Sequence, residues 1–516
     1  MEANLWQSLG TVLKLLLASR AVWYLVWRPY TMTSWFRRQG IRGPPYRFLV
    51  GSLPELKRML ATGRAKGLDV VSHDCVATVI PFFRKWESDY GKTFLYWLGP
   101  IPALCSTDMD LVKQVLTERT DLFQKDYMNP SLDAVLGNGV ILANGDDWKR
   151  RRKFVHPAFN QEKIKSMSAM AWECTQQTMD LWCAKMQAGN SQEAEIDMRH
   201  DSGEIAMSVI ARVMLGDNYK DAWEVFVASE ELLELAAYAL ADPPIPGFRY
   251  LPTRRNLRTR KLDKLVTCKI SQIIAARLAT GVYGDDLLGL MLQACSQPTA
   301  GAARLSTAEM IGECKTFFAA GHDTSANLIA WAMFLLARYP RWQEMVREEV
   351  GRECPDGASI ESLGKLKLLN MLLLETLRLY GPLGYLQRKT ASDTVLTNIM
   401  VPKGTMITIP LMMLHRDKEV WGADADEFNP MRFQNGVSSA AKHSNALLAF
   451  SYGPRICAGQ NFAMVEVQTV IATIVKRFSF SLSPGYVHKP SSFLTLRPRY
   501  GLPLIVRKLQ PDACVI

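Results

Sequence analysis

A ten-residue segment near the C-terminus constrains this chain most, because it places one cysteine in a turn just before a helix. The segment reads Phe450-Ser-Tyr-Gly453-Pro-Arg455-Ile-Cys457-Ala-Gly459. Its glycines permit the backbone angles of a tight turn, and the apolar residues 458–475 predict a helix whose positive end faces the sulfur. Together with the cation of Arg455, these features favour thiolate over thiol. We therefore expect Cys457 to be a nucleophile or a metal ligand.

The composition indicates a large folded protein, since 48% of its 516 residues are hydrophobic. The ten cysteines are scattered without a C-x-x-C pair or zinc spacing, which predicts reduced thiols in a protein that faces the cytosol. The formal net charge of +11 is compatible with nucleic acid, anionic lipid or an acidic protein as partner. Because no nucleic-acid-binding module is recognisable, we expect lipid and protein partners and no nucleic acid.

The N-terminal segment predicts a membrane anchor. Residues 9–27 are apolar and close to the ~20 residues that cross a bilayer, although Lys14 and Arg20 interrupt them. The arginines that follow place the rest of the chain in the cytosol; an interfacial helix is the alternative. We predict an anchor over 1–30, a basic, proline-containing hinge over 31–45 and one domain over 46–516. Helical periodicity dominates that domain, so the predicted fold is mainly α with small β-sheets.

A long helix is predicted from the capping box at Ser306 to about Arg338. Its centre reads Ala-Ala-Gly-His322-Asp323-Thr324. The small residues allow a bulky group to lie against the helix, and the adjacent acid and alcohol can hold water and pass protons. A kinked helix with satisfied polar groups is the alternative. We interpret His322 as structural and not as a ligand.

Five motifs, in chain order, resemble those of the cytochrome P450 superfamily. They are W-x-x-x-R at Trp148, A-G-x-D-T ending at Thr324, E-x-x-R at Glu375, P-x-R-F around Arg432, and the loop of Cys457. The resemblance implies the cytochrome P450 fold over residues 46–516, with Cys457 as the thiolate ligand of the iron in haem b (iron protoporphyrin IX). It also implies that Glu375, Arg378 and Arg432 form a buried triad that supports the cysteine loop.

The same resemblance assigns roles to individual residues. Asp323 and Thr324 would be catalytic, Asp323 by relaying protons and Thr324 by hydrogen-bonding the bound oxygen. The haem-binding residues would be Trp148, Arg152, Arg388, Phe450, Arg455 and Cys457. The arginines among them suit the haem propionates, because a guanidinium matches a carboxylate in charge and shape.

The implied function is a monooxygenase that uses O₂ and NADPH and hydroxylates a lipophilic small molecule. Its electrons would come from the membrane flavoprotein NADPH-cytochrome P450 reductase, and its place would be the endoplasmic reticulum membrane with the catalytic domain in the cytosol. Residues 39–47, Gln-Gly-Ile-Arg-Gly-Pro-Pro-Tyr-Arg, look like plant members that oxidise hormones, terpenoids or fatty acids. The basic side chains expected to point away from Arg152, and to form either a solvated face or the docking surface of the electron donor, are Lys149, Arg150, Arg151 and Lys153.

By the same resemblance, the substrate pocket would be lined by residues 129–142, 317–324, 383–386 and 497–501. Two other functions stay open at this point. One is a haem-thiolate isomerase or dehydratase that does not use O₂. The other is a non-catalytic, membrane-anchored binding protein in which Cys457 is only structural.

Overall fold

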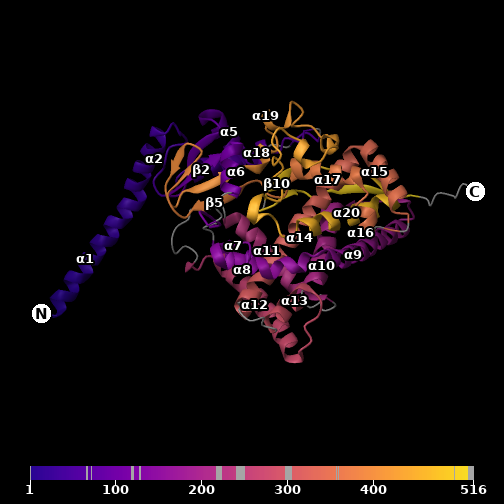
Figure 1. The fold of residues 1–516 in the computed structure, drawn as a ribbon, viewed down its shortest axis with the longest axis horizontal. Helices are drawn as coiled ribbons and strands as arrows, with labels where there is room; N and C mark the ends of the chain where they lie inside the picture. The colour runs from indigo at the N-terminus through magenta and orange to yellow at the C-terminus, as the bar shows by residue number, and fades with distance from the viewer. Residues whose placement is uncertain are drawn as a thin grey trace, which may run out of the picture.

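The computed structural model shows a body of helices and small sheets from which one N-terminal helix projects (Figure 1). The described residues are 2–65, 68–70, 72–117, 121–126, 130–216, 223–239, 250–296, 305–355, 357, 359–492 and 494–509. Helix α1 (Glu2–Val22) continues through a π-helical turn, η1 (Trp23–Trp27), into α2 (Arg28–Arg38). The stretch Trp6–Arg38 is long and apolar enough to cross a membrane, and none of its apolar window is buried in the protein.

The start of the body is tied to the first strand. Helix α2 buries Phe36, and Leu95 donates a backbone hydrogen bond to the carbonyl of Arg42 at 2.9 Å. At Gly43 an added Cβ would lie 1.7 Å from the carbonyl oxygen of Leu95, so only glycine permits this approach. The proline-containing segment after α2 therefore lies directly against strand β1 (Thr93–Leu98).

Helices make up most of the body. In the first half they are α3 (Leu53–Ala65), α4 (Val76–Val79), α5 (Pro81–Tyr90), α6 (Met109–Thr117), α7 (Pro130–Leu136), α8 (Gly145–Val155), α9 (Gln161–Ala188), α10 (Met198–Leu215) and α11 (Trp223–Ala239). In the second half they are α12 (Arg254–Thr280), α13 (Leu287–Ser296), α14 (Thr307–Arg338), α15 (Pro340–Glu353), α16 (Ile360–Leu363), α17 (Lys367–Tyr380), α18 (Leu411–Leu414), α19 (Lys418–Trp421) and α20 (Gln460–Arg477). The short 3₁₀ turns are η2 (His156–Phe159), η5 (Pro430–Phe433), η6 (Val437–Ser439) and η7 (Gly453–Arg455).

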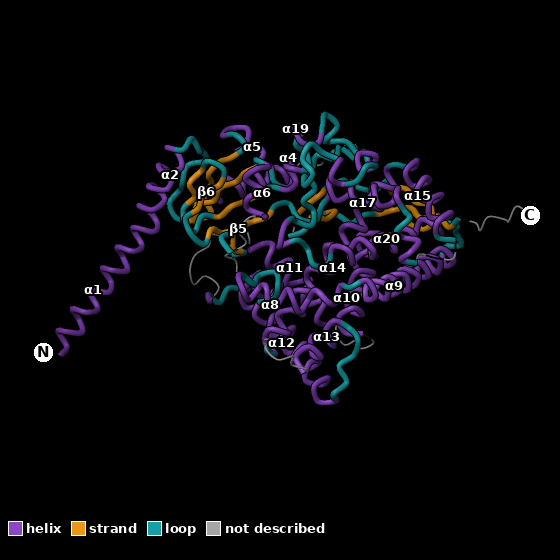
Figure 2. Tube along the Cα trace, in the orientation of Figure 1, coloured by secondary structure: helices purple, strands orange, loops and turns teal. Residues whose placement is uncertain are grey.

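Strands gather in two places, one beside α2 and one beside α15 (Figure 2). The largest sheet has the order β1-β2-β8-β5-β3, and its only parallel pair is β2 with β8. The other sheets have the orders β4-β12-β9, β10-β11 and β6-β7. The strands are β1, β2 (Ile101–Ser106), β3 (Phe123–Gln124), β4 (Glu193–Asp197), β5 (Leu386–Thr390), β6 (Thr394–Leu396), β7 (Ile399–Val401), β8 (Met406–Ile409), β9 (Phe478–Leu482), β10 (Pro490–Ser492), β11 (Leu496–Pro498) and β12 (Pro503–Lys508).

Helix α14 forms the centre of the body. The predicted capping box is present, because the Ser306 hydroxyl and the Glu309 carboxylate satisfy each other's backbone N–H groups. Nearly every side chain from 325 to 337 is buried, as expected for a helix with neighbours on all sides. It packs against α10, α17 and α20, so residues at its middle lie between elements far apart in the sequence. The expected mainly helical fold with small sheets is confirmed.

Candidate active site

The cysteine loop has the turn that its glycines predict. The N–H of Cys457 donates to the carbonyl of Phe450 at 3.0 Å, and the 3₁₀ turn η7 lies between them. Gly453 has φ 73°, and an added Cβ would lie 2.2 Å from the carbonyl oxygen of Leu116. The following helix, α20, begins at Gln460 and not at 458. The backbone of Gly459, its N-cap residue, forms a hydrogen bond that favours the thiolate of Cys457.

The expected thiolate does not follow from the protein chain alone. Burial raises the pKa of the Cys457 thiol, and this outweighs the opposing effects of the Gly459 hydrogen bond and the charges of Arg152 and Lys125. The residue is nevertheless accessible to solvent, although protein surrounds it. The expectation counted the favourable charges and omitted the desolvation of the sulfur. A metal cation at the sulfur would supply the missing stabilisation, because a coordinating thiol is deprotonated.

A cluster of cations surrounds this cysteine and includes a residue that sequence reasoning missed. The pKa of Lys125 lies well below its usual value because of burial and the nearby charges of Arg388, Arg455 and Arg152. The backbone of Lys125 is fixed by Asn144, whose side-chain amide accepts at 2.8 Å and donates at 3.0 Å. The residue types around Lys125 gave no signal, since its position depends on a contact nineteen residues away.

The predicted haem-binding residues in and near this cluster have defined contacts with the rest of the protein. The guanidinium of Arg455 lies 4.7 Å from the centre of the Trp148 ring, and it donates to the carbonyl of Ala143 at 2.8 Å. Arg388, on β5, is buried and donates to its neighbour's carbonyl at 2.7 Å. Phe450 is half-buried against the main core.

This donor set fits haem. The charges of Arg388, Arg455 and Arg152 act against that of Lys125, and the two propionates of a haem are carboxylates of suitable charge to reduce this repulsion. An accessible sulfur beside them, which receives a backbone hydrogen bond, suits an iron ligand. The cluster is therefore a candidate cofactor site, with cations that suit the carboxylates and a thiol that suits the metal.

The predicted charged triad is present and buried. Arg378 donates to both carboxylate oxygens of Glu375, at 2.7 and 2.8 Å, and the Nε of Arg432 lies 3.5 Å from the same carboxylate. Arg432 also donates to Asp424 at 2.8 Å. Glu375 is 0% and Arg378 1% exposed, so both depend on partners within the protein.

A histidine that the sequence did not single out connects the triad to the cysteine loop. Arg378 donates to the backbone carbonyl of His415 at 2.8 Å. The Nε2 of His415 accepts the N–H of Leu448 at 3.0 Å, and Leu448 in turn accepts the N–H of Ser451 at the start of the loop. Burial lowers the pKa of His415 to about 3, so the ring is neutral and keeps this acceptor.

The centre of α14 contains the predicted acid and alcohol. Asp323 is buried and ion-paired with Arg199 of α10 at 3.2 Å, and it also accepts hydrogen bonds from Thr495 and Asn327. The Thr324 hydroxyl donates to the carbonyl of Ala320 at 2.7 Å, which is a common local bond in helices. The ion pair shows that the acid is bound to a cation from another helix, which the sequence pattern did not predict.

Gly321 has a structural role in this region. A Cβ added there would lie 2.7 Å from the Cδ1 of Ile210, so the glycine allows α10 to pack closely on α14. His322 is buried, and desolvation lowers its pKa. The small residue was expected to make room for a bulky group, and at this position it makes room for a helix.

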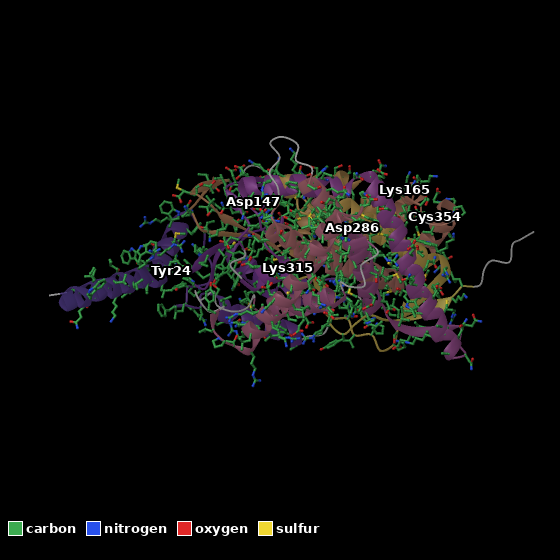
Figure 3. The ribbon with its side chains drawn as sticks, turned by 90° about the horizontal axis from the view of Figure 1, so that it is seen from below. Tyr24, Asp147, Lys165, Asp286, Lys315 and Cys354 are labelled. Carbon is green, nitrogen blue, oxygen red and sulfur yellow. The ribbon has the colours of Figure 1, made fainter. Side chains whose placement is uncertain are left out.

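The predicted basic surface is only partly present, and the expectation that all four side chains point outward is wrong. Arg151 is buried and ion-paired with Asp147, Glu309 and Glu313, at 2.8, 3.1 and 3.2 Å. Arg150 is half-buried and also pairs with Glu309. Figure 3 labels Asp147, which pairs with Arg151, and Lys315 of α14, which is buried and pairs with Asp263. Acidic residues of α14, about 160 positions away, neutralise the middle of the motif.

The exposed remainder of that surface is the pair Lys149 and Lys153. Lys149 forms an ion pair with Asp146 at 2.8 Å, and both of these side chains are mostly exposed. A shallow cavity of about 460 Å³ lies beside them, lined by Trp148, Lys149, Arg152, Lys153, His156 and Pro157.

A second cavity of about 460 Å³ lies between α7, α12 and the first turns of α14. It shares Asp133, Gly137 and Asn138 with the expected pocket segment 129–142, of which residue 129 lies outside the described residues. Its α14 residues lie between Ala308 and Lys315, before the expected 317–324. Since Cys457 is not among its lining residues, this cavity is separate from the cation cluster.

The family model "Cytochrome P450" matches residues 77–504. Cytochrome P450 709B1 of Arabidopsis thaliana is 41% identical over 95% of this chain and 96% of its own length. Cytochrome P450 734A6 of Oryza sativa subsp. japonica is 37% identical over 94% of this chain and 92% of its own length. Cytochrome P450 72A552 of Barbarea vulgaris is 36% identical over 95% of this chain and 94% of its own length.

A solved structure supports the fold independently. Retinoic acid bound cyanobacterial CYP120A1 superposes with a TM-score of 0.73 and 23% identity, over 83% of this chain and 94% of that one. At that identity the likeness concerns the fold alone. Because the family model spans most of the chain and the plant relatives match it almost end to end, this protein belongs to the cytochrome P450 family of monooxygenases.

Proposed function

We propose that the protein hydroxylates a lipophilic small molecule, such as a plant hormone, a terpenoid or a fatty acid, at a haem held by Cys457. The observation that carries this proposal is the joint position of an accessible cysteine sulfur and the cations of Lys125, Arg152, Arg388 and Arg455. No other arrangement described above offers both an iron ligand and partners for two carboxylates. The chemistry that haem supplies when bound is the activation of O₂.

The chain's own residues would bind and orient the cofactor. Cys457 would ligate the iron, and Arg152, Arg388 and Arg455, with Lys125, would hold the propionates. Trp148, against Arg455, would fix the direction of that guanidinium. The triad acts through the backbone of His415 and keeps the cysteine loop in place.

On the other side, Asp323 and Thr324 would handle protons. Arg199 and Thr495 hold the Asp323 carboxylate in place. The Thr324 hydroxyl donates to Ala320 in this structure, so it must rotate to donate to a ligand above the helix. The pair thus provides a carboxylate next to a rotatable hydroxyl, which suits proton delivery.

The helix Trp6–Arg38 would anchor the enzyme in the endoplasmic reticulum membrane, with residues 46–516 as the cytosolic catalytic domain. NADPH-cytochrome P450 reductase would supply the electrons, and the exposed Lys149 and Lys153 would contribute to its docking. A lipophilic substrate would reach the domain from the lipid, because the anchor keeps it at the membrane.

A difference spectrum of the reduced protein with carbon monoxide tests the ligand. We expect the red-shifted Soret band of a haem thiolate in the wild type and its loss in Cys457→Ser. The matched control is Cys268→Ser, which replaces an exposed cysteine of α12 and should keep the band. A persistent band in Cys457→Ser would show that another residue binds the iron.

Turnover with purified reductase distinguishes the reaction class. Lipids, terpenoids and hormones would first be screened for substrate-induced spectral shifts. The consumption of NADPH and O₂ would then be measured with the compound that binds best. A monooxygenase consumes both with each hydroxylated product. Product formation without O₂ consumption would contradict hydroxylation and favour an isomerase or dehydratase.

A further inference from the structure

A buried glutamate of α14 binds two other segments of the chain. Glu313 is 0% exposed, and one of its carboxylate oxygens pairs with the guanidinium of Arg151, on α8, at 3.2 Å. The other oxygen accepts the N–H of Val140, in the segment between α7 and α8, at 2.9 Å. Burial raises the pKa of Glu313, while the Val140 N–H and Arg151 favour the carboxylate. The iron ligation and the proton delivery proposed above do not use this residue.

The segment that contains Val140 lies against α14 because a glycine stands where the two backbones meet. A Cβ added at Gly139 would lie 2.2 Å from the hydroxyl oxygen of Thr316 and 2.8 Å from the carbonyl oxygen of Gly312, so a larger residue does not fit. The Thr316 hydroxyl also donates to the carbonyl of Leu136. The segment is thus bound to α14 by hydrogen bonds at two points, before and after this glycine.

The peptide group between Gly139 and Val140 connects Glu313 to the cation cluster. Its N–H donates to Glu313, and its C=O accepts the N–H of Ala143 at 3.0 Å. The C=O of Ala143 in turn accepts from the guanidinium of Arg455 at 2.8 Å. Because a peptide group is planar, a rotation that moves its N–H away from the carboxylate also moves its C=O. Hydrogen bonds in series therefore link the buried carboxylate to a guanidinium that is proposed to hold a propionate.

Two further cations of the cluster depend on the same contacts. Asn144, the next residue of the segment, accepts the backbone N–H of Lys125 at 2.8 Å and donates to its carbonyl at 3.0 Å. The other carboxylate oxygen of Glu313 binds Arg151, whose neighbour in α8 is Arg152. Glu313 thus holds both the helix that carries one cation of the cluster and the segment that fixes two others.

We propose that Glu313 is a positioning residue for the cofactor, which sets where the cations of the cluster meet the haem propionates. It acts through the backbone of Val140 and the side chain of Arg151. Changing the carboxylate weakens haem binding although every cation of the cluster is still present. This inference rests on the proposed haem site, and it assigns a function to a residue of α14 outside the motif of Asp323 and Thr324.

Transfer of haem from the loaded protein to apomyoglobin measures how firmly the cofactor is held. In Glu313→Met both partners lose the carboxylate, so we expect transfer to be about tenfold faster than in the wild type, which corresponds to the loss of one hydrogen bond to a charged group. Arg151 keeps Asp147 and Glu309 as partners, so its charge remains paired in this variant. Glu313→Gln keeps an oxygen that can accept the N–H of Val140, and transfer should be only about two- to threefold faster.

The matched control is Glu309→Gln. Glu309 lies one turn earlier on α14 and pairs with the same Arg151 at 3.1 Å, whereas the N–H of Val140 donates to Glu313. This control removes an equal charge from the same group of ion pairs and should keep the wild-type rate of haem transfer.

Two further measurements separate positioning from a purely structural role. The resonance Raman bending band of the haem propionates should shift in Glu313→Met and stay unchanged in Glu309→Gln. In the haem-free protein, the amide protons of Val140 and Ala143 should exchange faster in Glu313→Met, while those of α20 keep the wild-type rate. An equal increase of exchange in α20 would show a general loss of stability and contradict the positioning role.

Wild-type haem transfer with an unshifted Raman band in a folded Glu313→Met would overturn the proposal, as would equal changes in Glu309→Gln. A normal carbon monoxide band of the wild type shows in each case that only this inference fails, whereas its absence would contradict the proposed function itself. If Glu313→Met does not fold, Glu313→Asp takes its place, because it keeps the charge but is one methylene too short for both partners. A wild-type transfer rate in that variant would overturn the positioning role.

Discussion

Two groups of charged residues are connected to the cysteine loop, and they differ in burial and in how their charges are balanced: the triad is buried, whereas Lys125, Arg152 and Arg455 are half-buried. In the triad, Glu375 and Arg378 form a two-bonded ion pair, backbone groups satisfy the remaining hydrogen-bonding atoms, and Arg432 supplies a second cation. In the cluster of Lys125, the neighbouring charges are arginines, which lower its pKa. The first group holds the fold without any ligand. The second brings like charges together beside Cys457, which suits it to bind carboxylates.

The largest effect is expected from breaking the triad. Glu375→Ala leaves Arg378 as a buried, uncompensated charge, which should lower the free energy of unfolding by about 3–5 kcal/mol. Denaturant unfolding and haem content measure this. The control is Arg258→Ala, since its ion pair with Glu231 is exposed and should contribute less than about 1 kcal/mol. Equal losses in the two variants would contradict the comparison.

A third kind of buried ionisable group extends the comparison between the triad and the cation cluster. Glu466 of α20 bonds to Ser325 at 2.6 Å, and burial raises its pKa to about 8. The folded state therefore binds this proton more tightly than the unfolded state. Stability is fully present below about pH 4.5 and is lost as the pH rises toward about 8.

Glu466→Gln should remove that loss. At pH 8 we expect the variant to be more stable than the wild type by about 4 kcal/mol, and at pH 4 to be nearly equal to it. Denaturant midpoints at the two pH values provide the measurement. Glu162→Gln, which replaces an exposed glutamate of α9, should change neither. A gain of equal size at both pH values would show that the side chain is not protonated in the folded state.

Replacing a residue of the cation cluster should have opposite effects on the haem-free and the haem-loaded protein. Lys125→Met removes one of several like charges, so the haem-free protein should gain about 1 kcal/mol of stability. The haem-loaded protein should instead lose its cofactor several times faster to an acceptor such as apomyoglobin. The exposed Lys113→Met should affect neither quantity. Destabilisation of both forms would mean that Lys125 is a structural residue.

The smallest effect concerns the reduced basic surface. Lys153→Ala should raise the reductase concentration needed for half-maximal electron transfer by about two- to threefold, and high salt should abolish the difference, because exposed charges contribute about 0.5 kcal/mol each. Arg151→Ala should act through stability, since that side chain is buried among acids. A salt-dependent effect of Arg151→Ala on docking would show that the docking surface includes the buried part of the predicted set of four basic residues.

The motifs themselves could be recognised in the sequence because each is short. The spacing of Trp148 and Arg152, the capping box at Ser306 and the E-x-x-R pair all depend on the period of one helix, and the structure has each of them. Arg151 shows the limit of such reasoning. Helical periodicity states which residues share a face, but not which face another helix covers.

The sequence by itself thus determined the family, the mainly helical fold and the cysteine that is proposed to bind the iron. Only the tertiary structure decided which charges meet. Three contacts join segments that are far apart in the chain: Lys125 with the arginines, Arg199 with Asp323, and His415 with both the triad and the cysteine loop. Their energies arise from burial and from partners on other elements, and neither of these is written in local spacing.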